Sequence, residues 1–241
     1  MIRDIEQITG RRLVIYFANR YREAQINQRD CTFFAELFGD VGGAPVDLLL
    51  ETNGGETDAT EALIRLLQNL TPEFRVIIPN AAKSNGTLLS LAARSIIMGA
   101  ASELGPIEPS MSGIPVSVLM QPEMAQQNYP LHKLAEFAHK HSMQIARDLL
   151  AAGMMHGVDV TQIDAVVAKL AGRGSYFSHG SVIDHREAAA LGLNVEYLPP
   201  DSDLWCRIWL LYCMYEHDVQ RDGYLKVFEG RARSTAVNAP S

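Results

Sequence analysis

The stretch from Val76 to Pro109, VIIPNAAKSNGTLLSLAARSIIMGAASELGPIEP, places a serine between a strand and a helix. The apolar, β-branched run from Phe74 to Pro79 predicts a buried strand, and Leu88 to Arg94 predicts a helix. Ser84 lies in the tight turn between them. The backbone N–H groups that open a helix point toward the same place and carry partial positive charge. A nucleophile and a site for a developing oxyanion are the two components that acyl transfer needs.

The unit before this stretch has the same order of elements. A strand is expected from Val46 to Glu51, the turn TNGG follows from Thr52 to Gly55, and an amphipathic helix is expected from Thr57 to Leu70. Repeated strand–turn–helix units imply right-handed crossovers and a parallel sheet, which is an α/β fold. Such sheets bind ligands at the carboxyl ends of their strands, where both turns fall. Gly54 and Gly55 would let a substrate backbone approach closely.

The rest of the chain predicts a single domain over residues 1–230. Proline residues break regular structure between Gly99 and Asn128, so this segment is expected to be loop-like. The tail over residues 231–241 is expected to be disordered. Further strands are expected at Arg12 to Ala18 and Ser95 to Met98, and helices at Cys31 to Phe38, Leu131 to Ala152, Val160 to Leu170, Asp184 to Leu191 and Asp203 to His217.

Composition excludes several classes of partner. The 241 residues carry a net charge of −7 with no long basic run, which argues against nucleic acid or an anionic membrane surface. The charged N-terminal segment lacks the apolar core of a signal peptide, and no apolar stretch is long enough to span a bilayer. The three cysteines form no CxxC pair and are expected to be buried free thiols. A cytoplasmic location is the expectation that follows.

Three motifs carry a family resemblance: N-G-G after a strand, A-x-S-x-G before a helix, and L-G-P-I-E-P. Together they resemble the serine dehydrogenase proteinase family, a relative of the signal-peptide peptidase A and Clp proteolytic-subunit families. The likeness runs from about Arg11 to Tyr215 and is most specific in Ala82 to Pro109 and in Tyr176 to Leu193. It implies a Clp-protease/crotonase-like fold of repeated strand-turn-helix units with a mainly parallel sheet.

By this resemblance the chain is a serine endopeptidase-like hydrolase that cleaves peptide bonds through an acyl-enzyme. Ser84 is then the nucleophile, and the amides of Asn85 and of Gly54 or Gly55 form the oxyanion hole. In the family pattern the position after the serine is usually glycine, whereas this chain has Asn85.

The general base is not fixed by the resemblance. Clp proteolytic subunits use a histidine soon after the serine, but no histidine lies between Ser84 and His132. Lys133 occupies approximately the slot of the lysine in the peptidase relatives and is the first candidate; the alternative is a solvated helix face shared with Glu136 and Lys140. His179 falls near the slot of the third Clp-type residue and is a candidate base or orienting partner. Lys83 is the third candidate, but neighbouring side chains in a tight turn usually diverge.

No cofactor and no metal ion are expected, because the chain has no Walker loop, no GxGxxG after a strand and no clustered cysteine ligands. His132, Glu136 and His139 would share one side of a helix, which is more typical of a solvated surface than of a metal site. The resemblance implies a polypeptide substrate and a homo-oligomer. Nothing in the sequence identifies an accessory ATPase or a membrane partner.

The helix expected from Asp203 to His217 is the candidate oligomer interface, because its aromatic and aliphatic side chains are unusually dense. These are Trp205, Trp209, Leu210 and Tyr212. Two other functions fit the same fold. One is a catalytically inactive oligomeric scaffold, and the other is a crotonase-type acyl-CoA hydratase or hydrolase, which also places two N–H groups around a carbonyl.

Overall fold

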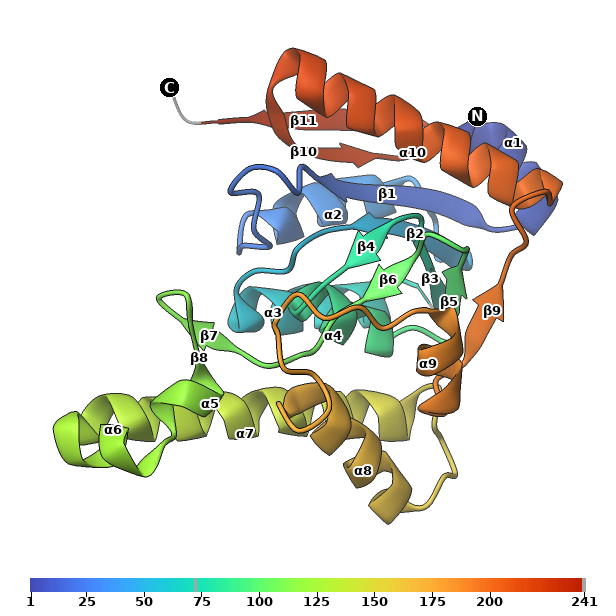
Figure 1. Ribbon diagram of the computed structural model, residues 1–241. Coiled ribbons are helices and arrows are strands. Elements are labelled where there is room, and N and C mark those ends of the chain that lie inside the picture. The colour runs from blue at the N-terminus through green and yellow to red at the C-terminus, as the bar shows by residue number, and fades with distance from the viewer. Residues whose placement is uncertain (72, 240–241) are drawn as a thin grey trace.

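The centre of the molecule is a seven-stranded sheet with the strand order β11-β10-β1-β2-β3-β5-β9 (Figure 1). It is described by a computed structural model that covers residues 1–71 and 73–239. The strands from β1 to β9 in that order are parallel, and β10 and β11 extend one edge in antiparallel pairing. The strands are β1 Arg12–Ala18, β2 Val46–Glu51, β3 Phe74–Ile78, β5 Ile96–Met98, β9 Val195–Tyr197, β10 Tyr224–Glu229 and β11 Ser234–Asn238.

Side chains of the parallel strands alternate between two cores, one on each face of the sheet. On β1, Leu13 and Phe17 pack on the face covered by α1 (Ile2–Thr9) and α10 (Asp203–Asp222), whereas Tyr16 faces the larger, opposite core. Because helices cover both faces, the central residues of these strands are mostly apolar on both faces. The larger core is covered by α2 Asp30–Gly39, α3 Thr57–Leu70, α4 Asn85–Leu91, α7 Tyr129–Ala152, α8 Val160–Ala171 and α9 His185–Ala190 (Figure 1).

The segment from Gly99 to Asn128 was expected to be loop-like, and it contains short regular elements instead. Pro122 opens a helix because proline lacks the N–H that the first turn leaves unpaired in any case. The prolines therefore mark boundaries between short elements. These elements are β6 Glu103–Leu104, β7 Ser110–Met111, β8 Ile114–Pro115, α5 Val116–Leu119 and α6 Pro122–Gln127, and β6 pairs in parallel with β4 Ala81–Ala82.

The expectation of a disordered tail from residue 231 is wrong for most of that segment. Strand β11 pairs antiparallel with β10, with Ala236 opposite Val227 and Ser234 opposite Glu229. Its sequence STAVN carries too few apolar residues to signal a strand by itself, and pairing with the sheet edge supplies the missing hydrogen bonds. Residues 240 and 241 of the expected tail lie outside the described residues.

Helix α10 differs from its prediction in length and in the direction of its side chains. It continues past His217 to Asp222 and ends at Gly223, whose φ of 72° is left-handed. Trp205 and Tyr212 pack into the core, while Trp209 and Leu210 are 37% and 53% exposed. Cys206 and Cys213 are also exposed, which corrects the expectation of buried thiols. No helix in the described residues is long and apolar enough to cross a membrane.

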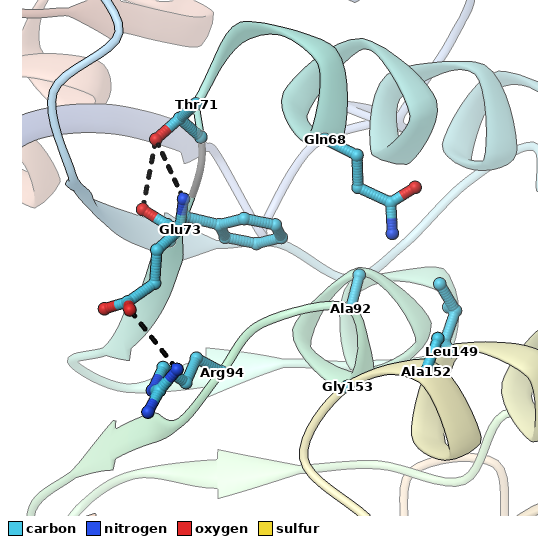
Figure 2. A pocket seen from close by; sticks show the side chains of 9 residues that line it. Gln68, Thr71, Glu73, Ala92, Arg94, Leu149, Ala152 and Gly153 are labelled. Carbon is cyan, nitrogen blue, oxygen red and sulfur yellow. Dashed lines mark hydrogen bonds and ion pairs between the residues drawn. The ribbon is translucent and has the colours of Figure 1, made fainter. Parts of the chain in front are cut away.

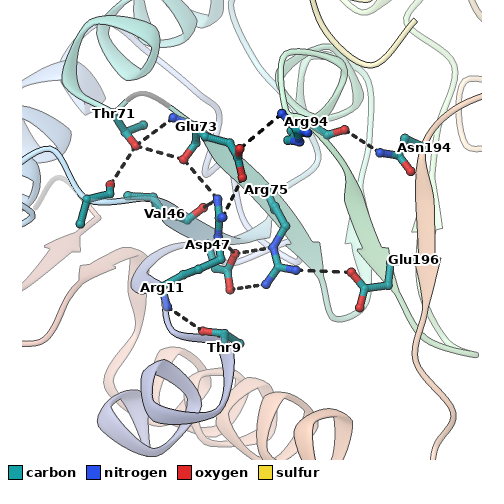
Figure 3. A network of polar contacts seen from close by, with 11 residues as sticks. Thr9, Arg11, Val46, Asp47, Thr71, Glu73, Arg75, Arg94, Asn194 and Glu196 are labelled. Carbon is teal, nitrogen blue, oxygen red and sulfur yellow. Dashed lines mark hydrogen bonds and ion pairs between the residues drawn. The ribbon is translucent and has the colours of Figure 1, made fainter.

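The amino ends of the parallel strands are joined by a network of ion pairs (Figure 3). Asp47 on β2 is fully buried and accepts hydrogen bonds from Arg11 and from Arg75, each with an N–O distance of 2.8 Å. Arg11 also pairs with Glu73 at 2.8 Å. A buried carboxylate is tolerated only when it is paired and hydrogen-bonded, and Asp47 meets both conditions.

Candidate active site

Ser84 lies at the carboxyl edge of the sheet, in the turn between β4 and α4. Its φ of 52° and ψ of −119° are unusual for a residue that carries a side chain. The turn is closed by hydrogen bonds from Gly86 N to Lys83 O at 2.7 Å and from Leu88 N to Ser84 O at 3.1 Å. Backbone conformations of this kind cost on the order of 1–3 kcal/mol and cluster at active sites. A strained strand-to-helix turn is also how α/β-hydrolases expose a nucleophilic serine.

A cavity of about 410 Å³ brings together most of the residues singled out by the sequence. Ser84, Asn85, Gly54, Gly55 and His179 all line it. The β7–β8 hairpin closes another side through residues 109, 110, 112 and 113. Four segments therefore meet at this cavity: the turn after β2, the turn before α4, the β7–β8 hairpin and the segment that carries His179. The sequence pattern predicted a common location only for the two turns.

The glycine turn after β2 packs directly against the serine turn. A Cβ added at Gly54 would lie 2.9 Å from both Asn85 N and Ser84 Cβ, so no other residue fits there without displacement. The φ of Gly54 is also +98°, which favours glycine. Its N–H donates to Thr52 Oγ1 at 3.0 Å and is therefore already used. Gly55 is consequently the better candidate donor of the two glycines.

The backbone N–H groups of Gly55 and Asn85 belong to residues that line the cavity, and neither has an acceptor in the described part of the chain. The C=O of Gly54 accepts from Ile26 N at 2.9 Å, and a trans peptide points its N–H opposite to its C=O. The N–H of Gly55 therefore points away from Ile26. Asn85 opens α4, so its N–H is one of the groups that a helix leaves unpaired.

His179 lies in the same cavity as Ser84, on the segment between α8 and α9. Its Nδ1 is buried and has no hydrogen-bond partner among the described residues. Burial lowers the pKa of His179, and this is opposed by the nearby Glu108 carboxylate. Glu108 is itself buried and pairs with Arg173 at 2.9 Å. The imidazole is thus neutral at pH 7 and able to accept a proton.

Lys83 is buried, and its side chain is used by other parts of the fold. Its Nζ lies 3.1 Å from each of three acceptors: the carbonyls of Leu104 and Ser181 and the carboxylate of Glu103. Burial lowers the pKa of Lys83, while Glu103 opposes that effect. Because an ammonium has three N–H donors, all of them are engaged. This side chain ties β6 and the segment before α9 to the serine turn.

Lys133 is placed on α7 and is not among the residues that line the Ser84 cavity. Its Nζ pairs with Glu136 at 2.7 Å and lies 5.6 Å from the centre of the Tyr129 ring. The hydrogen bond to Glu136 raises the pKa of Lys133, which is the opposite of what a lysine base needs. Of these two candidates, His179 lines the same cavity as Ser84 and Lys133 does not.

Sequence reasoning missed Glu51 and Arg20, which support the glycine turn. Glu51 accepts from Ala81 N at 3.0 Å, and burial raises its pKa to about 7. Arg20 lies 3.5 Å from Glu51 and exchanges hydrogen bonds of 2.8 Å with Asn53 in both directions. The signal that could have identified Glu51 is its position, because this charged residue ends the mostly apolar strand VDLLLE immediately before the glycine turn.

A second cavity of about 390 Å³ lies at the opposite, amino end of the strands (Figure 2). Three of its polar side chains are bonded to neighbours: Thr71 Oγ1 contacts two backbone carbonyls at 3.0 Å, and Glu73 pairs with Arg94 at 3.4 Å. It holds no serine, cysteine or histidine. No group of three or more metal-ligating side chains is placed to hold a metal ion within residues 1–71 and 73–239.

Comparisons with known proteins agree with this geometry at the level of family and fold. A family model described as ClpP-like SDH-type serine proteinase matches residues 39–226. Two uncharacterized proteins of Methanocaldococcus jannaschii are similar in sequence, one 28% identical over 183 residues and the other 35% identical over 77 residues. These matches cover 74% and 32% of this chain, and the chain spans 61% and 26% of the length of these relatives.

Two solved structures of ClpP1 from Listeria monocytogenes, one of them a mutant, are similar to this chain with a TM-score of 0.50 each. They are 14% and 13% identical to it and cover 83% and 80% of it, while the chain covers 98% and 95% of theirs. At this identity the likeness concerns the fold alone. The predicted Clp-like α/β fold with a mainly parallel sheet is thereby confirmed.

Proposed function

This chain belongs to the ClpP-like SDH-type serine proteinases, and we propose that it hydrolyses peptide bonds through an acyl-enzyme on Ser84. One observation carries the proposal. A serine with a left-handed φ shares a cavity with two unpaired backbone N–H groups and a neutral histidine. These are a nucleophile, an oxyanion site and a base, which is the set that acyl transfer requires.

In the first half of the reaction, Ser84 Oγ attacks the carbonyl carbon of the peptide bond while His179 takes its proton. The carbonyl oxygen becomes an oxyanion and accepts hydrogen bonds from the N–H groups of Gly55 and Asn85. The C–N bond then breaks, and the leaving amine takes the proton from His179. The product is an ester on Ser84. In the second half, His179 takes a proton from water, the hydroxide attacks the ester, and the carboxylic acid leaves as Ser84 regains its proton.

The assignment of His179 as the base rests on placement and protonation together. It lines the Ser84 cavity, whereas Lys133 does not, and the three N–H donors of Lys83 are engaged. Its lowered pKa leaves it unprotonated at neutral pH. The charge of Glu108 favours the imidazolium that forms during proton transfer, as the carboxylate does in serine–histidine–aspartate enzymes.

Reaction of the folded protein with a fluorophosphonate probe tests the proposal. We expect covalent labelling that disappears in Ser84→Ala and persists in Ser90→Ala. Ser90 is a matched control because it lies on α4, the helix that follows Ser84, and is buried with its hydroxyl bonded to Gly86 O. An intact wild-type protein that resists labelling would contradict the proposal and favour an inactive scaffold. Tight binding of coenzyme A esters without labelling would favour an acyl-CoA hydratase or hydrolase.

Self-association through α10 is part of the same proposal. Trp209, Leu210 and Met214 are 37%, 53% and 49% exposed on the outer side of this helix. Sedimentation velocity of the wild type and of the Leu210→Glu variant measures this directly, and we expect the variant to sediment as a smaller species. Identical sedimentation of the two proteins would exclude this face as the interface.

A further inference from the structure

We propose that the side chain of Asn85 is a positioning residue that holds the Gly55 peptide in the orientation the oxyanion site needs. This inference rests on the proposed function and adds a role for a side chain to the one already given to the backbone of Asn85. Asn85 thus acts at both donors: its N–H is one of them, and its carboxamide fixes the chain that carries the other.

The contacts of the carboxamide are specific. Asn85 Nδ2 donates to Gly55 O at 2.5 Å and lies 3.3 Å from Thr57 Oγ1. The residue is only 7% exposed, so its side chain is held between the serine turn and the glycine turn. A carboxamide has two N–H donors, and these two acceptors use both of them. Its side chain therefore has no proton left to donate to an oxyanion, which makes its role one of positioning.

Gly55 needs such a contact because glycine moves more freely about φ and ψ than any other residue. The peptide before it is held by Ile26, whose N–H donates to Gly54 O at 2.9 Å. In the peptide after it, Glu56 N donates to Ile26 O at 2.9 Å, and Asn85 binds the Gly55 carbonyl from the other side. Gly55 is thus held between the backbone of Ile26 and the side chain of Asn85.

Loss of the Asn85 contact would leave the peptide after Gly55 held on one side alone. The preceding peptide, which carries the Gly55 N–H, would then be anchored by the hydrogen bond from Ile26 N to Gly54 O alone, and its orientation beside the Asn85 N–H would be fixed less tightly. Oxyanion donors contribute to catalysis only when they are preorganised toward the transition state. The expected consequence is a lower kcat with a nearly unchanged KM, because substrate binding in the ground state does not depend on that donor.

Two variants of Asn85 test the inference. In Asn85→Ala the contact is absent, and we expect kcat to fall about 10- to 100-fold with KM changed less than about threefold. In Asn85→Asp a carboxylate faces the Gly55 carbonyl and repels it. A protonated carboxyl can donate, so the ratio of the kcat of Asn85→Asp to that of the wild type should rise as the pH falls from 8 to 5.

Asn194→Asp is the matched control for this change. Asn194 Nδ2 donates to the backbone carbonyl of Arg94 at 2.9 Å, at the amino end of the strands (Figure 3). We expect its kcat ratio to the wild type to stay flat across the same pH range. Circular dichroism establishes that each variant is folded. If Asn85→Ala does not fold, the pH dependence of Asn85→Asp decides the matter alone.

Wild-type kcat in a folded Asn85→Ala protein would overturn the inference, as would a flat pH ratio for Asn85→Asp. Failure of the underlying function has a different signature, which is a wild-type protein whose Ser84 does not react with the fluorophosphonate probe. The two failures are therefore distinguishable in one set of measurements.

Discussion

The two ends of the parallel strands differ in how their polar groups are bonded. At the amino end, Asp47 is bonded to two arginines and Glu73 pairs with Arg11 and Arg94 (Figure 3). At the carboxyl end, the N–H groups of Gly55 and Asn85 have no acceptor among the described residues. The first arrangement satisfies its charges internally, while the second leaves two N–H donors unpaired, and the proposed function assigns these donors to the oxyanion.

Cavity size does not separate the two ends, because their cavities measure about 390 and 410 Å³. What separates them is the chemistry of the lining. The carboxyl end has a strained serine, unpaired donors and a neutral histidine, and the amino end has committed ion pairs. Parallel α/β sheets place ligands at the carboxyl ends of their strands for this reason. Mutations should therefore affect catalysis at one end and stability at the other.

The largest effect is expected from His179→Ala, which removes the proposed base. We expect kcat/KM to fall about 10²- to 10⁴-fold, the usual contribution of general base catalysis. Because burial lowers the pKa of His179, the imidazole stays unprotonated at pH 7, and wild-type kcat/KM should decline only below its ordinary value of about 6.5. Peptide hydrolysis measured between pH 5 and 8 checks both points.

His139→Ala is the control for that change. The pKa of His139 is likewise lowered by burial, and its Nδ1 is also unpartnered among the described residues, but it does not line the Ser84 cavity. In His139→Ala, kcat/KM should still decline at acid pH as it does in the wild type. Equal losses of kcat/KM in His179→Ala and His139→Ala would show that a position in the Ser84 cavity does not identify the base.

The next largest effect is expected from Gly54→Ala. Its kcat should fall about 10²- to 10³-fold, the cost of removing one oxyanion donor. The new methyl group would lie 2.9 Å from Asn85 N and cover that N–H. Gly43→Ala is a matched variant, since Gly43 also has a positive φ of +73° but has open space around it. It should lose about 1 kcal/mol of stability and keep its kcat. Comparable kcat values for the two variants would contradict the role of the glycine turn.

Asp47→Asn tests the amino end. Removing this buried negative charge leaves Arg11 and Arg75 without their shared partner, and breaking such a pair costs about 3 kcal/mol of unfolding free energy. Urea unfolding measures the loss. The folded variant should hydrolyse peptides with wild-type kcat, and a large fall in kcat would show that the two ends are coupled.

The smallest effect is expected from Arg94→Ala at the second cavity (Figure 2). Its side chain is 71% exposed and lies 3.4 Å from Glu73, and exposed pairs of this kind contribute less than about 1 kcal/mol. Thermal unfolding and peptide hydrolysis should both stay close to the wild type. A loss of hydrolysis without a loss of stability would give this cavity a function that its lining does not suggest.

Much of the fold could be predicted because its local signals are strong. The predicted bounds of β1, β2 and α3 agree with the structure, since strands covered on both faces are continuous apolar runs and α3 has a clear apolar stripe. The strand β11 could not be predicted, because its stability comes from pairing with β10 rather than from its own side chains. The short helices α5 and α6 were not predicted either, because they are stabilised by packing on α7 rather than by a long local pattern.

The serine turn follows from local sequence, because a strand, a glycine-containing turn and a helix in that order leave few conformations for Ser84. The residues that surround it depend on tertiary contacts. His179 is 95 positions away in the chain, and it reaches the cavity because the segment between α8 and α9 folds back over the sheet edge. A lysine can also act as a general base, but Lys133 lies on α7, where its Nζ pairs with Glu136. Local patterns specify turns, whereas contacts between distant segments depend on how the whole core packs.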